Sequence, residues 1–128
     1  MTENELKTRT KQFALRVLHM SESLPKGMAA EVMGRQLIRS AASVAANYRA
    51  VCRSRSKADF VAKLGIVEEE ADECGFWLEM IAEAGLLAPG KLMSLRQEAD
   101  ELTAIFVSSL KTARDGRKNP KSALQNPK

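Results

Sequence analysis

Residues 40–78, SAASVAANYRAVCRSRSKADFVAKLGIVEEEADECGFWL, decide the fold of this 128-residue chain. They predict two long helices joined by one tight turn. In the second of these helices, apolar or small residues recur at alternating intervals of four and three, the register of a helix that packs in a bundle. The positions are Phe60, Leu64, Val67, Ala71, Cys74, Leu78, Ile81 and Gly85. We therefore predict a helix over residues 57–85.

The first half of the segment belongs to a second predicted helix, over residues 28–53. Its buried stripe follows the same alternation, and its small residues allow a neighbouring helix to approach closely. The stripe comprises Ala30, Gly34, Leu37, Ala41, Val44, Tyr48 and Val51. Ser56 is placed to cap the following helix, and Asp59 lies near its positive end. The turn is therefore expected at residues 54–56.

Two further apolar patterns flank this pair and predict helices over residues 4–23 and 89–114. The first stripe comprises Leu6, Phe13, Ala14, Val17, Leu18 and Leu24. The last comprises Leu92, Leu95, Ala99, Leu102, Phe106 and Leu110. Four amphipathic helices with short connections predict an all-α fold, an antiparallel up-down-up-down four-helix bundle formed by residues 1–114. Residues 115–128 are basic and poor in apolar side chains, so a disordered tail is expected there.

Charge is segregated along the chain, although the overall formal charge is only +4. Residues 1–56 carry a net charge of +6, residues 57–110 carry −7, and residues 111–128 carry +5. A basic half and a basic tail are typical of proteins that bind nucleic acid. The same asymmetry also suits neighbouring subunits that pair a basic face with an acidic one.

The basic residues of the helix predicted over 28–53 share one face. At about 100° per residue, its four arginines fall within an arc of roughly 80°, nearly opposite the buried stripe. With the turn, the candidate phosphate-binding residues are Arg35, Arg39, Arg49, Arg53, Arg55 and Lys57. The alternatives are a solvated helix face and a face that pairs with acidic residues of another subunit.

The helix predicted over 57–85 carries apolar residues on its outer face as well. Trp77 and Met80 have little reason to point outward in a monomeric bundle, and aromatic and methionine side chains ringed by charge are typical of protein interfaces. The candidate interface comprises Ile66, Glu69, Glu70, Glu73, Trp77 and Met80. We therefore predict a homo-oligomer. The alternative is a bundle wide enough to bury both faces of this helix.

No catalytic, metal or cofactor site is predicted. The chain has a single histidine, His19, and no Glu-x-x-His pair of the kind that di-metal bundles use. It also lacks a Ser/His/Asp set and a glycine-rich phosphate loop. No stretch is apolar enough to span a bilayer, and the N-terminus lacks a signal peptide's apolar region. We expect a cytoplasmic, non-enzymatic protein.

The chain resembles the four-helix bundle proteins encoded in intervening sequences of bacterial large-subunit ribosomal RNA genes. The resemblance is carried by QLIRSAASVAANYR at residues 36–49 and RSRSKADFVAKLGIVEEEADECGFWLEMI at residues 53–81. The matching positions are Gln36, Leu37, Arg39, Ser43, Asn47, Ser56, Phe60, Lys63, Leu64, Glu69, Glu73, Trp77 and Leu78. Ala50 stands where many members of this family have a glutamate.

This resemblance implies a fold similar to the accessory proteins of diversity-generating retroelements, which form pentameric barrels with basic surfaces. It therefore implies a ring of about five subunits. It also suggests RNA or another nucleic acid as a partner, although resemblance in fold does not settle function. Two hypotheses follow from the residues and the resemblance together. One is a non-catalytic oligomer that binds nucleic acid, and the other is a scaffold whose charged faces serve assembly and recruit a partner protein.

Overall fold

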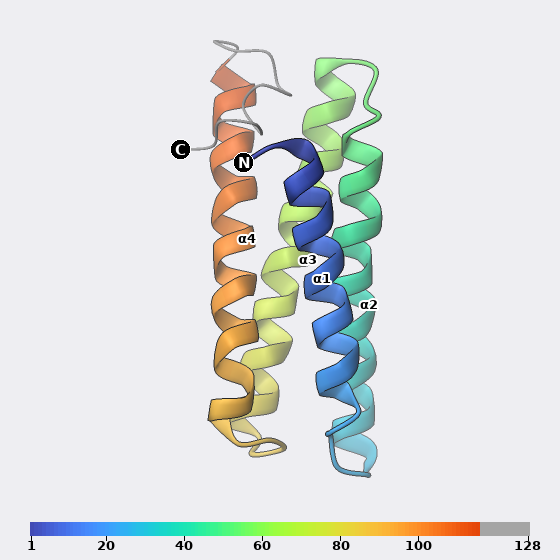
Figure 1. Ribbon diagram of the computed structural model, residues 1–128, viewed down its shortest axis with the longest axis vertical. Coiled ribbons are helices and arrows are strands. Elements are labelled where there is room, and N and C mark those ends of the chain that lie inside the picture. Colours follow the sequence, from blue (N-terminus) through green and yellow to red (C-terminus); the bar gives the residue numbers. More distant parts are fainter. Residues whose placement is uncertain (116–128) are drawn as a thin grey trace.

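The computed structural model describes residues 1–115, which form four helices connected by short turns. The helices are α1 (Glu3–Ser21), α2 (Met28–Val51), α3 (Lys57–Glu83) and α4 (Pro89–Asp115). Successive helices run in opposite directions along one long axis (Figure 1), so the predicted up-down-up-down bundle is confirmed. The helix ends lie within two residues of the prediction. Apart from Asp115, the predicted tail lies outside the described residues.

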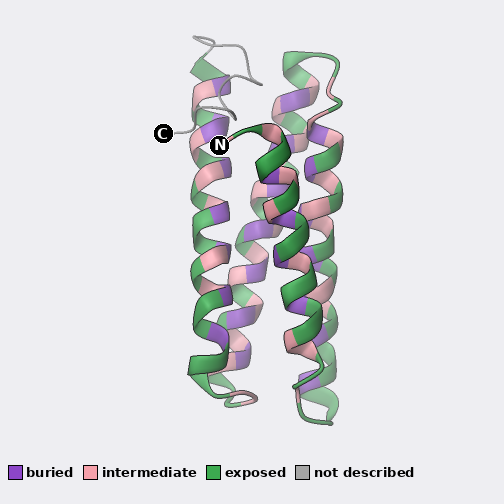
Figure 2. Ribbon diagram, in the orientation of Figure 1, coloured by how far each residue is buried: buried purple, intermediate pink, exposed green. Residues whose placement is uncertain are grey.

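The core lies along the axis between the four helices, where the buried positions face one another (Figure 2). Every predicted stripe residue of α2 and α4 is buried, and so are seven of the eight in α3. The exception is Gly85, which follows α3 and takes a φ of 71°. That left-handed conformation favours glycine because it has no Cβ, so Gly85 serves the turn and not the core.

The stripe of α1 is narrower than the sequence predicts. Leu18 is 45% exposed, whereas Thr10, a polar residue, is fully buried. Thr10 is tolerated in the core because its hydroxyl donates a hydrogen bond to the Lys7 carbonyl at 3.0 Å. The prediction of Leu18 as a core residue is therefore wrong, because α1 turns that position toward the outer edge of its contact with α2.

The turn between α2 and α3 is built as its sequence predicts. Ser56 adopts an extended conformation, and its hydroxyl accepts a hydrogen bond from the Asp59 backbone N–H at 3.0 Å. This contact satisfies one of the backbone donors that the first turn of a helix leaves free. The side chain of Asp59 pairs with Lys63 at 3.0 Å. The start of α3 is thus fixed by local contacts.

The four helix contacts are unequal. Among neighbouring helices, the consecutive ones make the most extensive contacts, and α1 and α4 make the least extensive one. Polar side chains connect these two helices: Arg9 of α1 contacts Glu98 through Nε at 2.7 Å and Nη2 at 2.8 Å, and Glu101 at 2.7 Å. The hydrogen bond to Glu98 raises the pKa of Arg9, and the charges of Glu98 and Glu101 reinforce this shift. The paired carboxylates thus hold the charged form of Arg9 between the two helices.

Candidate nucleic-acid interface

Ion pairs divide the predicted arginine face into two parts. Arg39 contacts two carboxylates of α3: Nη1 lies 3.3 Å from Glu70 Oε2, and Nη2 makes a short contact with Glu73. Arg35 pairs with Glu31 of its own helix at 2.8 Å. Both arginines lie on the face that the sequence predicts. Their charges are already matched inside the chain, so phosphate would have to compete with a carboxylate for them.

Glu73 is the centre of a polar network between α2 and α3. The hydroxyl of Ser40, which is fully buried, donates to Glu73 Oε2 at 2.5 Å, and the Trp77 indole donates to the same oxygen at 3.4 Å. The hydrogen bond from Ser40 is the largest reason why the pKa of Glu73 lies below its ordinary value of 4.5, with Trp77 and Arg39 adding to it. The network therefore prefers the ionised form of Glu73.

This shift predicts a stability difference that depends on pH. A carboxyl group whose pKa is lowered by folding stabilises the protein above its unfolded pKa, and this contribution is lost as pH falls through the folded pKa. Glu73→Gln is therefore expected to cost about 1 kcal/mol at neutral pH, because a partly exposed charged acceptor is lost. The difference in thermal midpoint between Glu73→Gln and the wild type should shrink as the pH falls below 4.5, the ordinary pKa of a glutamate side chain.

Glu69→Gln is the matched control for this experiment, because Glu69 is an exposed residue of the same helix that forms no ion pair within residues 1–115. Its thermal midpoint should follow that of the wild type at every pH. A Glu73→Gln gap that stays constant from neutral to acid pH would contradict the assigned role of Glu73.

The second part of the basic face lies where α2 ends and α3 begins. We name it the turn cluster, and it consists of Arg49, Arg53, Arg55 and Lys57. All four residues are exposed, and within residues 1–115 none of their side chains forms an ion pair with a carboxylate. The nearby acid, Asp59, is paired with Lys63, which is the main cause of its lowered pKa, and the charge of Arg55 adds to this shift without forming an ion pair. The turn cluster is thus the part of the predicted surface that presents unmatched positive charge to solvent.

The predicted interface of α3 is also only partly exposed. Ile66 is 46% exposed, but Trp77 is half-buried and packs against the core from the side of α2. The expectation that Trp77 points outward is therefore wrong, because its indole reaches toward Glu73 in the polar network. Glu69 is exposed, and Glu70, Glu73 and Met80 are partly buried.

Phe76 is the exposed aromatic residue that the sequence analysis missed. It is 50% exposed, and its ring meets Trp77 edge-on with the two centroids 4.9 Å apart. The sequence does indicate that Phe76 is exposed, because it lies midway between the buried stripe positions Cys74 and Leu78. At about 100° per residue, that spacing places it opposite the core. The outer face of α3 therefore presents Phe76 and Ile66, with Trp77 beneath.

The residues that could supply metal or nucleophilic chemistry are dispersed. No group of three or more His, Cys, Asp or Glu side chains that could hold a metal ion occurs in the described part of the chain. Burial raises the pKa of the Cys74 thiol to about 12, so this residue stays in its unreactive, protonated form. None of the four described helices is both long and apolar enough to cross a membrane.

The fold and the charged surfaces define a four-helix bundle with an unmatched basic end and an acidic third helix. A family model described as "23S rRNA-intervening sequence protein" matches residues 2–108. The chain therefore belongs to this family, which confirms the resemblance seen in the sequence.

A solved structure supports the same assignment. The chain is similar to a protein of unknown function from the S23 ribosomal protein family of Bacteroides thetaiotaomicron. The two are 30% identical and superpose with a TM-score of 0.76, over 82% of this chain and 97% of the other. No curated protein matches the chain.

Proposed function

We propose that this chain is a non-catalytic, homo-oligomeric protein that binds RNA through the turn cluster. The observation that carries the proposal is that Arg49, Arg53, Arg55 and Lys57 form no ion pair within residues 1–115, whereas Arg35 and Arg39 do. Unpaired, exposed cations contact phosphates without first breaking an ion pair, and guanidinium groups match phosphate geometry well. Membership in a family named for an intervening sequence of 23S rRNA makes RNA the nucleic acid to test first.

Recognition at this surface would be of the backbone and not of the bases. Exposed aromatic rings on which bases could stack are absent from the turn cluster, because Phe76 lies nineteen residues beyond Lys57, or about 28 Å along α3. Contacts to phosphate carry no direct sequence information. We therefore expect binding that depends strongly on salt and little on sequence.

Assembly is the second part of the proposal, and the outer face of α3 carries it. Phe76 and Ile66 are large apolar side chains that are about half exposed on one helix. Apolar groups ringed by charge are typical of a surface that another protein covers. We propose that a second copy of the chain covers it. The ring of about five subunits implied by the family resemblance stays a prediction.

The scaffold hypothesis draws on the same surface of α3 and loses part of its support. It expects arginines to meet Glu69, Glu70 and Glu73 of a neighbouring subunit, but Arg39 already pairs with Glu70 and Glu73 within one chain. The exposed side chains of Phe76 and Ile66 on α3 remain available to a partner protein. A stable oligomer that does not bind RNA would favour this alternative.

The experiment is a titration of labelled single-stranded RNA with the protein at salt concentrations from about 50 to about 200 mM. Each phosphate contact contributes about 0.7 to the slope of log affinity against log salt for a single strand. The double variant Arg53→Gln/Arg55→Gln is therefore expected to make this salt dependence shallower, reducing the magnitude of the slope by about 1.4.

The control is Lys26→Gln/Lys91→Gln, which removes the same charge from exposed positions at the opposite end of the bundle (Figure 1). Its slope should match that of the wild type. The proposal fails if the wild type does not bind RNA, or if the two double variants behave alike.

A further inference from the structure

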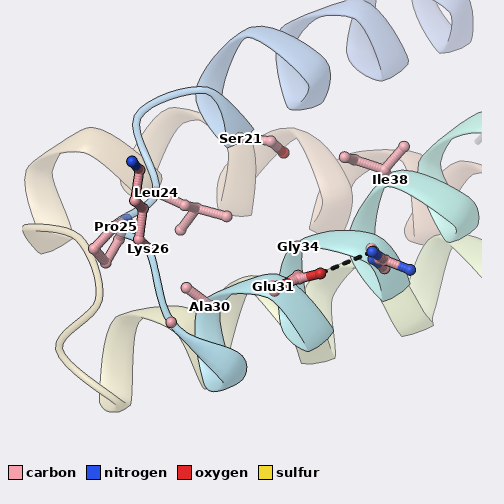
Figure 3. A pocket seen from close by; sticks show the side chains of 10 residues that line it. Ser21, Leu24, Pro25, Lys26, Ala30, Glu31, Gly34 and Ile38 are labelled. Atoms are coloured by element: carbon pink, nitrogen blue, oxygen red, sulfur yellow. Dashed lines mark hydrogen bonds and ion pairs between the residues drawn. The ribbon is translucent and has the colours of Figure 1, made fainter.

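The contact between α1 and α2 leaves a groove along its outer side. Near the turn that joins these helices, Leu24, Ala30, Gly34 and Ile38 line this groove, with the Arg35–Glu31 ion pair at its rim (Figure 3). Its continuation is lined by Leu18 of α1 and Ile38 of α2. Leu18 and Ile38 therefore flank the same groove from opposite sides and fix how the two antiparallel helices are aligned.

Beyond the groove, this alignment places two basic residues across the contact between α1 and α2 from each other. Lys7 precedes Leu18 by eleven residues, and Arg49 follows Ile38 by eleven. Eleven residues are almost exactly three helical turns, so each cation lies on the same side of its helix as the apolar residue. Because the helices are antiparallel, both steps run the same ~16 Å toward the turn cluster. Lys7 and Arg49 therefore face each other across the contact between α1 and α2, as Leu18 and Ile38 do.

We propose that Lys7 and Lys11 of α1 join Arg49 of α2 and Arg53 of the turn that follows it in one phosphate-binding surface across the contact between α1 and α2. The ligand is the sugar–phosphate backbone of RNA, and the inference rests on the function proposed above. Lys7 and Lys11 lie ~6 Å apart along α1, Arg53 follows Arg49 by four residues just beyond the end of α2, and helices in contact lie ~8–10 Å apart. Four cations at these spacings can contact successive phosphates of one strand.

The basic residues of α1 lie on two different sides of the helix. Arg9 and Arg16 face α4, where Arg9 pairs with Glu98 and Arg16 donates a hydrogen bond to Ser94. Lys7 is partly exposed and Lys11 exposed, and neither side chain has an ion pair within residues 1–115. The lysines of α1, which form no ion pair with the described residues of α4, lie on the same side of the helix as Leu18, the side next to α2.

The same geometry sets where the surface ends. Toward the turn between α1 and α2, the groove is lined by Glu22 and Glu31 together with Leu18 and Leu24. The carboxylate of Glu22 repels a phosphate backbone, Glu31 already holds Arg35 in an ion pair, and the aliphatic groups offer phosphate no contact. RNA would therefore cross the end of the bundle that carries Lys7 and Arg49 and would not follow the groove along its whole length.

The test is the RNA titration with Lys7→Gln/Lys11→Gln, compared with the wild type, Arg53→Gln/Arg55→Gln and the control Lys26→Gln/Lys91→Gln. Removing two contacts is expected to lower the salt slope by about 1.4 in the Lys7/Lys11 variant and to leave the control unchanged. Glutamine keeps the helix propensity close to that of lysine, and a thermal melt of each variant checks that the bundle is intact.

The outcomes separate this inference from the function on which it rests. If the wild type does not bind, or Arg53→Gln/Arg55→Gln leaves the slope unchanged, the proposed function fails. If that variant lowers the slope but Lys7→Gln/Lys11→Gln matches the control, only the two-helix surface is overturned. A Lys7/Lys11 variant that changes the mass of the assembly and not the salt slope also overturns it, since these residues would then contact another subunit.

Discussion

Replacing Phe106 by alanine is expected to lower the free energy of unfolding by about 3–5 kcal/mol, because a buried aromatic ring is lost and a cavity remains. Phe106 is fully buried, and its ring packs on that of Tyr48 with a centroid distance of 5.9 Å. The two rings belong to α4 and α2, which lie diagonally across the bundle. Their contact therefore fills the centre that all four helices surround.

Denaturant unfolding of the purified variant measures this loss. Phe76→Ala is the matched control, because it deletes the same ring from a position that is 50% exposed. Its cost should stay near or below about 1 kcal/mol, as is usual for substitutions outside the core. Equal losses for the two variants would contradict the assignment of Phe106 to the core and of Phe76 to the surface.

Phe76→Glu is expected to convert the proposed oligomer into smaller species. The substitution places a charge beside Trp77 on the outer face of α3, where its desolvation on assembly would be unfavourable. Trp77 is less suitable for this test, because it is half-buried and its indole donates a hydrogen bond to Glu73. Its substitution would disturb the bundle as well as the interface. The measurement is the molar mass in solution by light scattering coupled to size exclusion.

Leu15→Glu provides the control for charge and exposure. Leu15 is 39% exposed on α1, so the same kind of change is made on a different helix. Its mass should remain that of the wild type. A folded Phe76→Glu variant with unchanged mass would remove α3 as the contact between subunits, and a monomeric wild type would remove the oligomer itself.

Much of the fold follows from the spacing of apolar residues. The alternation of four and three in α2 and α3 extends over several turns, and one face of a straight helix has to be covered wherever it does so. In α1 the pattern is short, and Leu18 could belong to the stripe or to its edge. Only the packing of α2 beside it decides that Leu18 stays exposed, with Thr10 buried in the core.

The candidate site was less predictable, because charge on a helical face does not reveal which residues are already paired. The sequence predicts Arg39 and Arg53 on the same helical face, yet α2 ends before Arg53, and only Arg39 reaches carboxylates of α3. That difference depends on which part of α3 lies opposite, which is a property of the packed pair. Lys7 was overlooked for the same reason, since its relation to Arg49 exists only once α1 and α2 are aligned.

The sparse contact between α1 and α4 bears on the order in which the molecule is built. These helices stand at the two ends of the described chain, whereas α2 and α3 are neighbours in sequence with a local turn between them. Contacts between neighbours form with little loss of chain entropy, and α4 is synthesised last. We therefore expect α1 to pack against α2 early in a newly made chain. The bundle closes last, when α4 packs beside α1 and Glu98 pairs with Arg9.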